Sequence, residues 1–115
     1  MAEQRMDAIL LDGSGSFLAF RALIAELAAT SRIPVVYPYR DYVEQGGLMA
    51  FAPDLGELAE RMASDVHQIF DGAKAADIPF YLPNKFQLIV NLKAAKVIGI
   101  ELSPTLLARA DEVIE

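Results

Sequence analysis

The chain contains no cysteine and no tryptophan, and only one histidine among its 115 residues. Without cysteine it cannot form a disulfide, a catalytic thiolate or a thiolate-ligated metal site. A single histidine also excludes a metal site built from two histidines of one chain. The composition therefore removes zinc-finger, thiol-enzyme and disulfide-framework classes, and it predicts neither a bound metal nor a cofactor.

Basic residues are scarce: 10 Lys and Arg stand against 16 Asp and Glu, for a net charge of −6. This balance argues against general binding of nucleic acid or of an anionic membrane surface, because both depend on clustered positive charge. No apolar run approaches the roughly 20 residues that span a bilayer. The opening "MAEQRMDAILL" is too short and too acidic for a secretory signal, so the chain as written reads as cytoplasmic.

What the sequence does have is apolar content, with 54% hydrophobic and 23% charged residues. Such a chain can bury a core, and its length fits a single domain over residues 1–115. A domain of this size buries roughly 60–70% of the surface that its unfolded chain exposes, so it is small enough to gain stability from a partner.

Short apolar runs alternate with helical patterns along the chain, which is typical of an α/β domain. We expect a parallel sheet of three to four strands with flanking helices. The expected strands are 6–11, 33–37, 47–52 and 85–91, and the expected helices are 17–30, 40–45, 54–71, 91–99 and 103–110.

The helix expected at 54–71 has the clearest signals. Asp54 with Glu57 three residues later forms a start like a capping box, and Gly72 supplies the stop. Its apolar residues share one face, which predicts core or interface packing rather than a cofactor site. His67 lies on the opposite, polar face and is interpreted as a surface residue. Ser16 is expected to cap the helix at 17–30, and the acid-rich end 108–115 is interpreted as a solvated terminus.

Ligands of open parallel sheets bind outside the carboxyl ends of the strands. Those ends are the loops 12–16, 37–42 and 51–53, so a ligand site is expected there and no catalytic residue is assigned. The candidate ligand-binding residues are Asp12, Ser14, Ser16, Tyr39, Arg40 and Phe51.

The first two loops have more than one interpretation. The segment "DGSGS" (12–16) could hold an anion on its backbone N–H groups, but it lacks the lysine of a P-loop. It is either a flexible turn with a serine cap, a direct ligand contact through Asp12, Ser14 or Ser16, or a nucleotide-binding turn. Arg40 either holds a ligand carboxylate as a bidentate fork or pairs with Asp41 or Glu44 at the surface. Tyr39 and Phe51 are candidates to cover an apolar ligand body.

A set of segments in fixed order gives the chain a family resemblance. These segments are "VEQGGLM", "PDL", "GAKAADIP", "KFQLIVNLKAA" and "LSPTLLARADEVIE". Together they resemble the C-terminal part of ABC-transporter substrate-binding proteins of the tryptophan/tyrosine type, which have the type I periplasmic binding fold. The similarity covers residues 35–115 well and residues 6–34 more loosely.

The resemblance implies one lobe of a two-lobed, non-catalytic solute-binding protein, working outside the cytoplasm with a membrane permease and its ATPase. It implies amino acids or related small carboxylated molecules as ligands. In that fold the helix at 54–71 would pack on a lobe that this chain lacks, so its partner is either that lobe or a second protomer in a homodimer. A different class, a small α/β enzyme that uses "DGSGS", stays open as a weaker alternative.

Overall fold

The structure is a computed structural model in which residues 6–115 are described. Residues 1–5, the start of the segment judged too short and too acidic for a secretory signal, lie outside them. The chain forms two compact units, one made of the residues up to Ala52 together with Gln87–Glu115 and the other of Pro53–Phe86. Within residues 6–115, no helix is both long and apolar enough to cross a membrane.

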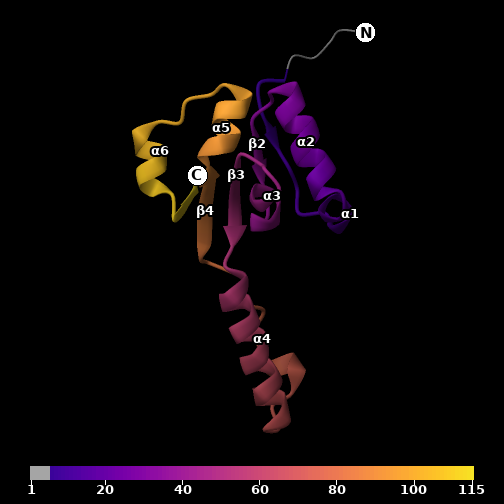
Figure 1. Ribbon diagram of the computed structural model, residues 1–115. Coiled ribbons are helices and arrows are strands. Elements are labelled where there is room, and N and C mark those ends of the chain that lie inside the picture. The colour runs from indigo at the N-terminus through magenta and orange to yellow at the C-terminus, as the bar shows by residue number, and fades with distance from the viewer. Residues whose placement is uncertain (1–5) are drawn as a thin grey trace. The chain divides into compact units, whose positions relative to one another are not determined.

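Within residues 6–115, the first unit is built on a five-stranded sheet whose strands follow one another in chain order (Figure 1). Strand β2 pairs in parallel with both β1 and β3, and β4 pairs in parallel with β5. The strands are β1 (Ile9–Leu10), β2 (Val35–Tyr37), β3 (Met49–Pro53), β4 (Phe86–Asn91) and β5 (Glu112–Ile114). The predicted α/β class with a largely parallel sheet is confirmed, with one strand more than expected.

Strands β3 and β4 run in opposite directions (Figure 1). The N–H of Asn91, at the end of β4, donates to the carbonyl of Leu48 before β3 (2.8 Å), while the N–H of Asp54 after β3 donates to the carbonyl of Lys85 before β4 (3.0 Å). The start of one strand therefore faces the end of the other. The otherwise parallel sheet is antiparallel at this pairing because β3 leads into the second unit and β4 returns from it.

Helices α1 (Gly15–Ala19) and α2 (Arg21–Ser31) replace the single helix predicted at 17–30. They meet at Phe20, whose N–H donates to the Phe17 carbonyl (3.0 Å) in a tight turn and whose carbonyl accepts from Ile24 (2.9 Å). The N-cap of α1 is Ser14, so the prediction of Ser16 as the cap is wrong. The first helix begins at Gly15 rather than at the predicted residue 17, and it ends before the bend at Phe20.

The remaining helices of the first unit are close to the predicted ranges: α3 (Arg40–Glu44), α5 (Leu92–Ile98) and α6 (Pro104–Arg109). The Oδ1 atom of Asn91 caps α5 by accepting from the N–H of Ala94 (2.9 Å), and Ser103 Oγ caps α6 by accepting from Leu106 (3.2 Å). Gly99 ends α5 in the left-handed region, where glycine carries no steric penalty.

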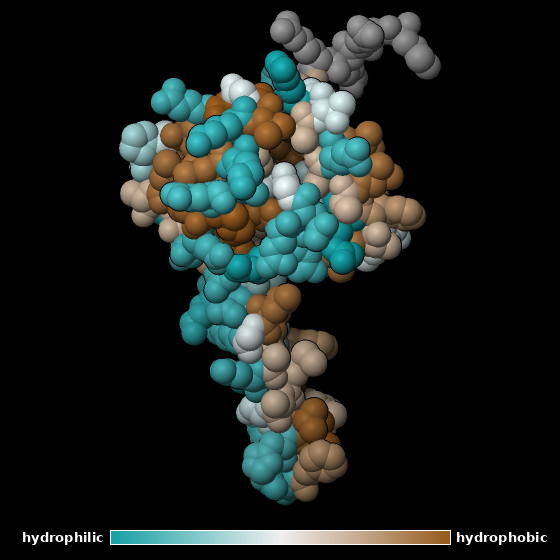
Figure 2. All heavy atoms as spheres, in the orientation of Figure 1, coloured by the Kyte–Doolittle hydropathy of each residue, from teal (hydrophilic) through white to brown (hydrophobic). Residues whose placement is uncertain are grey.

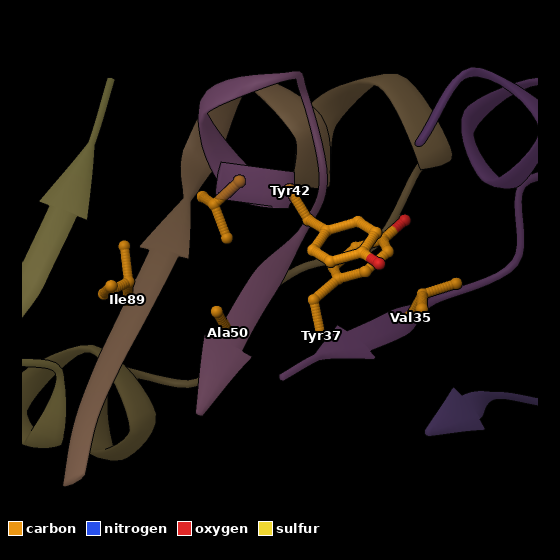
Figure 3. Packing of buried hydrophobic residues seen from close by; sticks show 6 residues of the cluster. Val35, Tyr37, Tyr42, Ala50 and Ile89 are labelled. Atoms are coloured by element: carbon orange, nitrogen blue, oxygen red, sulfur yellow. The ribbon is translucent and has the colours of Figure 1, made fainter. Parts of the chain in front are cut away.

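The core of the first unit centres on two stacked tyrosines (Figure 3). The rings of Tyr37 on β2 and Tyr42 on α3 lie 4.8 Å apart between centroids and 14° from parallel. Both are buried together with Val43, Ala50 and Ile89. Buried aromatic rings contribute large apolar areas, so this pair anchors α3 on the sheet immediately after β2.

The C-terminal segment joins the sheet as β5. Asp111 pairs with Leu88 in both directions: its N–H donates to the Leu88 carbonyl (2.9 Å), and its Oδ2 accepts from the Leu88 N–H (2.7 Å). None of residues 108–115 is buried, which agrees with a solvated terminus, but the segment also forms a paired strand that this interpretation does not include. The carboxylate of Asp111 accepts a hydrogen bond from the backbone of β4, whereas the sequence suggests only that this side chain is solvated.

The second unit consists of α4 (Leu55–Phe70), the 3₁₀ helix η1 (Ala75–Asp77) and extended chain. Asp54 caps α4 by accepting from the N–H groups of Gly56 (2.9 Å) and Glu57 (3.2 Å), as predicted. None of residues 53–86 is buried. Figure 2 shows hydrophobic side chains along one side of this unit and hydrophilic ones along the other.

Candidate functional site

The loop after β1 is shaped by Asp12. Its Oδ1 atom accepts a hydrogen bond from the N–H of Ser14 (2.8 Å), which folds the chain into a turn just before α1. This bond occupies the Ser14 N–H, so the turn uses one of the amides that an anion-holding loop would offer. The side chains of Asp12, Ser14 and Ser16 are exposed, and the latter two present hydroxyls to solvent.

Tyr39 joins this loop to the one after β2. Its hydroxyl donates to the carbonyl of Gly13 (3.2 Å), across 26 residues of sequence. A Cβ atom at position 13 would lie only 3.0 Å from the same hydroxyl, so glycine permits the approach. The structure thus brings together the 12–16 loop and Tyr39, as the argument from strand ends predicts. Gly13 itself was not among the candidates, although its place between two polar residues at a strand end was a signal.

Arg40, the next residue, is held by two carboxylates. Its Nε donates to Glu44 Oε1 (2.7 Å) one turn along α3, and its two terminal nitrogens donate to the two carboxyl oxygens of Glu112 on β5, with Nη2 to Oε1 at 2.7 Å. The pairing with Glu44 is one of the two interpretations drawn from the sequence. The bidentate partner, 72 residues away in sequence, carries no sequence signal.

These contacts perturb both partners of the pair. Hydrogen bonds from Arg40 lower the pKa of Glu112, and the bond to Glu112, followed by that to Glu44, raises the pKa of Arg40. Both side chains are about two-fifths exposed, so solvent weakens the pairing and a competing carboxylate can reach it. The guanidinium of Arg40 thus already binds a carboxylate in bidentate geometry, and that carboxylate is the chain's own Glu112.

Two other candidates lie apart from this cluster in the fold. Ser16 lies within α1, one turn beyond the Asp12 turn. Phe51 is on β3, between the buried Ala50 and Ala52. Because side chains alternate along a strand, its exposed ring lies on the sheet face opposite to the one that these two alanines face. The sheet order separates β3 from β1 by one strand.

Beneath the loops lies the buried hydroxyl of Tyr42, which has no hydrogen-bond partner among the described residues. Burial raises the pKa of Tyr42, and the charges of Tyr39 and Asp12 add to the shift. The Tyr37 hydroxyl is affected in the same way: burial raises the pKa of Tyr37 to about 12. Both buried phenols therefore stay neutral at physiological pH.

The polar groups at these strand ends are one carboxylate, serine hydroxyls, a phenol and an arginine. Groups of these kinds hold small polar ligands in proteins. In the part of the chain that the structure describes, no three His, Cys, Asp or Glu side chains group as metal ligands do.

Comparison with known proteins gives the family. The family described as ABC transporter substrate binding protein matches residues 5–114. The chain belongs to that family. None of the curated protein sequences compared with this chain matches it.

Solved structures share the fold of this family member. A conserved domain protein from Vibrio cholerae O1 biovar El Tor is 22% identical, with a TM-score of 0.88 over 93% of this chain. The ABC domain from Streptococcus pneumoniae, solved in complex with L-Trp, is 25% identical, with a TM-score of 0.86 over 96% of this chain. CD0873, a substrate-binding protein with adhesive properties from Clostridium difficile, is 19% identical, with a TM-score of 0.63 over 92%.

The chain spans little more than a third of these relatives. The matched region covers 36% of the Vibrio protein, 38% of the Streptococcus protein and 36% of CD0873. The resemblance inferred from sequence motifs to substrate-binding proteins is confirmed, and the match is confined to one part of each relative's length.

Proposed function

We propose that this chain is the C-terminal lobe, with its crossing segments, of the solute-binding component of an ABC importer. The family match over residues 5–114 carries the proposal. In this view the first unit is the lobe and Pro53–Phe86 is the segment that crosses to the other lobe. The protein is non-catalytic, works outside the cytoplasm, and delivers its solute to a membrane permease.

The proposed solute is an amino acid or a related small carboxylated molecule. The Streptococcus relative, solved with L-Trp, supports this choice, as does the arginine fork on α3. Arg40 exchanges Glu112 for the ligand carboxylate, while Tyr39 or Phe51 covers the ligand side chain. Asp12, Ser14 and Ser16 supply polar contacts from the loop after β1.

The test is a thermal-shift screen of the twenty amino acids, with L-Trp first, on the chain alone and co-expressed with the remainder of a family member. We expect L-Trp or another amino acid to raise the melting temperature, and Arg40→Ala to abolish the rise. Arg109→Ala, which removes an arginine from α6, is the matched control and should leave it unchanged. No shift for the restored protein would refute the assignment, and an equal shift in Arg40→Ala would remove that residue from the site.

A second candidate is a homodimeric interaction module without a transport role. The observation that favours it is α4: Met62 is 67% exposed, Val66 50% and Ile69 45%, all on one helical face. A helix with no buried residue is not stable through propensity alone, so it needs a partner surface. In the transport proposal that surface is the other lobe, and in the dimer it is a second copy, reached by exchange of α4 or β4 between protomers.

Light scattering at tens of micromolar protein separates the two candidates. A dimer that Val66→Asp converts to monomer, while the polar-face control Glu60→Ala does not, would support self-association. A monomer at every concentration would eliminate the module and leave the second lobe as the partner of α4.

A further inference from the structure

Glu112 is the first residue of β5, and the direction of that strand brings it to the candidate site. Strand β5 runs parallel to β4, with Glu112 beside Ile89. The start of β4 lies at the sheet edge where β3 ends, because the N–H of Asp54 donates to the carbonyl of Lys85 (3.0 Å). The start of β5 therefore lies toward the edge that carries the loops after β1 and β2, and the Glu112 carboxylate can act there.

The contacts of Arg40 leave no bidentate edge of its guanidinium open. A guanidinium offers a carboxylate two such edges, one made by the two terminal nitrogens and one made by Nε with a terminal nitrogen. Glu112 occupies the first edge with both carboxyl oxygens, and Glu44 Oε1 holds the Nε of the second at 2.7 Å. A ligand carboxylate can bind Arg40 in bidentate geometry only after one of the two glutamates has left.

Of these two glutamates, Glu112 is the one whose departure exposes the whole terminal edge of Arg40. Glu44 is one turn along the same helix and holds a single nitrogen, so α3 keeps it beside the arginine. Glu112 reaches Arg40 from a strand, and its side chain is 40% exposed. Release of an exposed glutamate costs little, because solvent takes over its hydrogen bonds.

We propose that Glu112 is an intrachain competitor for the ligand carboxylate: it occupies the terminal edge of Arg40 in the chain without ligand and is released to solvent when an amino acid binds. This inference rests on the proposed function, because it assigns Arg40 to the ligand. The apparent dissociation constant then equals the intrinsic one divided by the fraction of molecules in which Arg40 is free. Glu112 thereby sets the solute concentration at which the site fills.

The elements in contact with β5 carry no other cation that holds Glu112. Residues 87–91 of β4 are uncharged. The charged residues of α5 are Lys93 and Lys96, which line a separate hollow beside the C-terminal residue. Hydrogen bonds from Arg40 are the main cause of the lowered pKa of Glu112. Departure from Arg40 should therefore return that pKa toward the ordinary glutamate range.

Three substitutions separate occupancy of Arg40 from a simple effect of charge. Glu112→Gln removes the charge and leaves only a weak partner for Arg40, so we expect L-Trp to bind about threefold to fivefold more tightly. Glu112→Asp keeps the charge but is one methylene shorter, so the bidentate contact is weakened and affinity should rise as well. Glu44→Gln removes a charge beside the same arginine without freeing its terminal nitrogens, and we expect a change of about twofold at most.

Isothermal titration calorimetry measures these affinities on the full chain, alone and co-expressed with the remainder of a family member. L-Trp is the first probe, and the other amino acids follow if it releases no heat. Circular dichroism checks that each variant keeps its fold. In an NMR titration, the ligand should raise the pKa of Glu112 toward its ordinary range, which a pair with only a structural role would not show.

The outcomes distinguish this inference from the proposed function. If no amino acid binds either the wild-type chain or Glu112→Gln, both fall together. If an amino acid binds through Arg40 but binds Glu112→Gln no more tightly than the wild type, the proposed function stands and the competitor is refuted. A gain in Glu44→Gln equal to that in Glu112→Gln, with none in Glu112→Asp, would show that charge alone acts and would also overturn the inference.

Discussion

Gly47 offers the sharpest test of the packing that positions the site loops. It follows the helical turn α3 and is buried against the tyrosine pair. A Cβ atom added there would lie 2.6 Å from Cε2 of Tyr37 and 2.7 Å from the carbonyl oxygen of Tyr42. Its neighbour Gly46 needs glycine for a different reason, a φ of +94°. At position 47 the constraint is space, so we predict that Gly47→Ala destabilises the fold.

The surroundings leave little freedom to relieve the contact. The N–H of Gly47 donates to the same Tyr42 carbonyl (2.8 Å), and the Tyr37 ring is stacked on a fully buried neighbour. Overpacking of a core costs about 1–3 kcal/mol, and rigid neighbours place this case near the upper end. The loss of chain entropy in the unfolded state offsets roughly 0.4–1 kcal/mol of it. The net expected loss is about 2 kcal/mol in the free energy of unfolding.

Urea unfolding followed by circular dichroism measures this loss. With a slope of about 1–3 kcal/mol per molar urea, the midpoint should fall by roughly 1 M. Gly15→Ala is the control, because a Cβ atom at this first residue of α1 meets nothing within 4 Å. We expect that variant to change stability by less than about 0.5 kcal/mol. If Gly47→Ala unfolds at the same urea concentration as Gly15→Ala, the reasoning from packing is refuted.

Asp54→Ala removes the acceptor for two N–H groups of α4 and should lower helix stability by about 1 kcal/mol, seen as reduced helical circular dichroism, while Glu60→Ala should not. The pKa of Glu112 is lowered in the folded chain by its bonds from Arg40, so this pair stabilises the fold above the ordinary glutamate pKa, and its contribution disappears as the pH falls through the lowered value. In an NMR titration, Arg40→Ala should raise the Glu112 pKa toward its ordinary range and Arg109→Ala should not; an unchanged pKa in Arg40→Ala would contradict the assigned cause.

Local signals in the sequence predict most of the elements. The cap at Asp54, the proline at the first position of α6 and the glycine after α5 are short-range patterns, and each marks a real helix boundary. The errors arise where tertiary contacts decide. Strand β5 forms because Asp111 and its neighbours pair with β4, and no apolar run announces it. The bend at Phe20 likewise has no glycine or proline to mark it.

The candidate site is predictable to a similar degree. Strand-end geometry correctly places Tyr39 beside the 12–16 loop, because loops at the same edge of neighbouring parallel strands meet. The partner of Arg40 is not predictable, since Glu112 lies on a strand that the sequence does not reveal. A contact over 72 residues depends on the whole topology, whereas the Arg40–Glu44 pair depends only on helical spacing.

Because β3 and β4 pair antiparallel, the segment between them, residues 53–86, can in principle be removed without breaking the sheet. The departing and returning strands are neighbours in the sheet, so in topological terms residues 53–86 are an insertion at the tip of a hairpin. Joining Ala52 to Gln87 through an Asn-Gly turn would close that hairpin with the connection that two adjacent strands favour. The sheet and its tyrosine core would then form a smaller independent domain, and other segments could be inserted at the new turn.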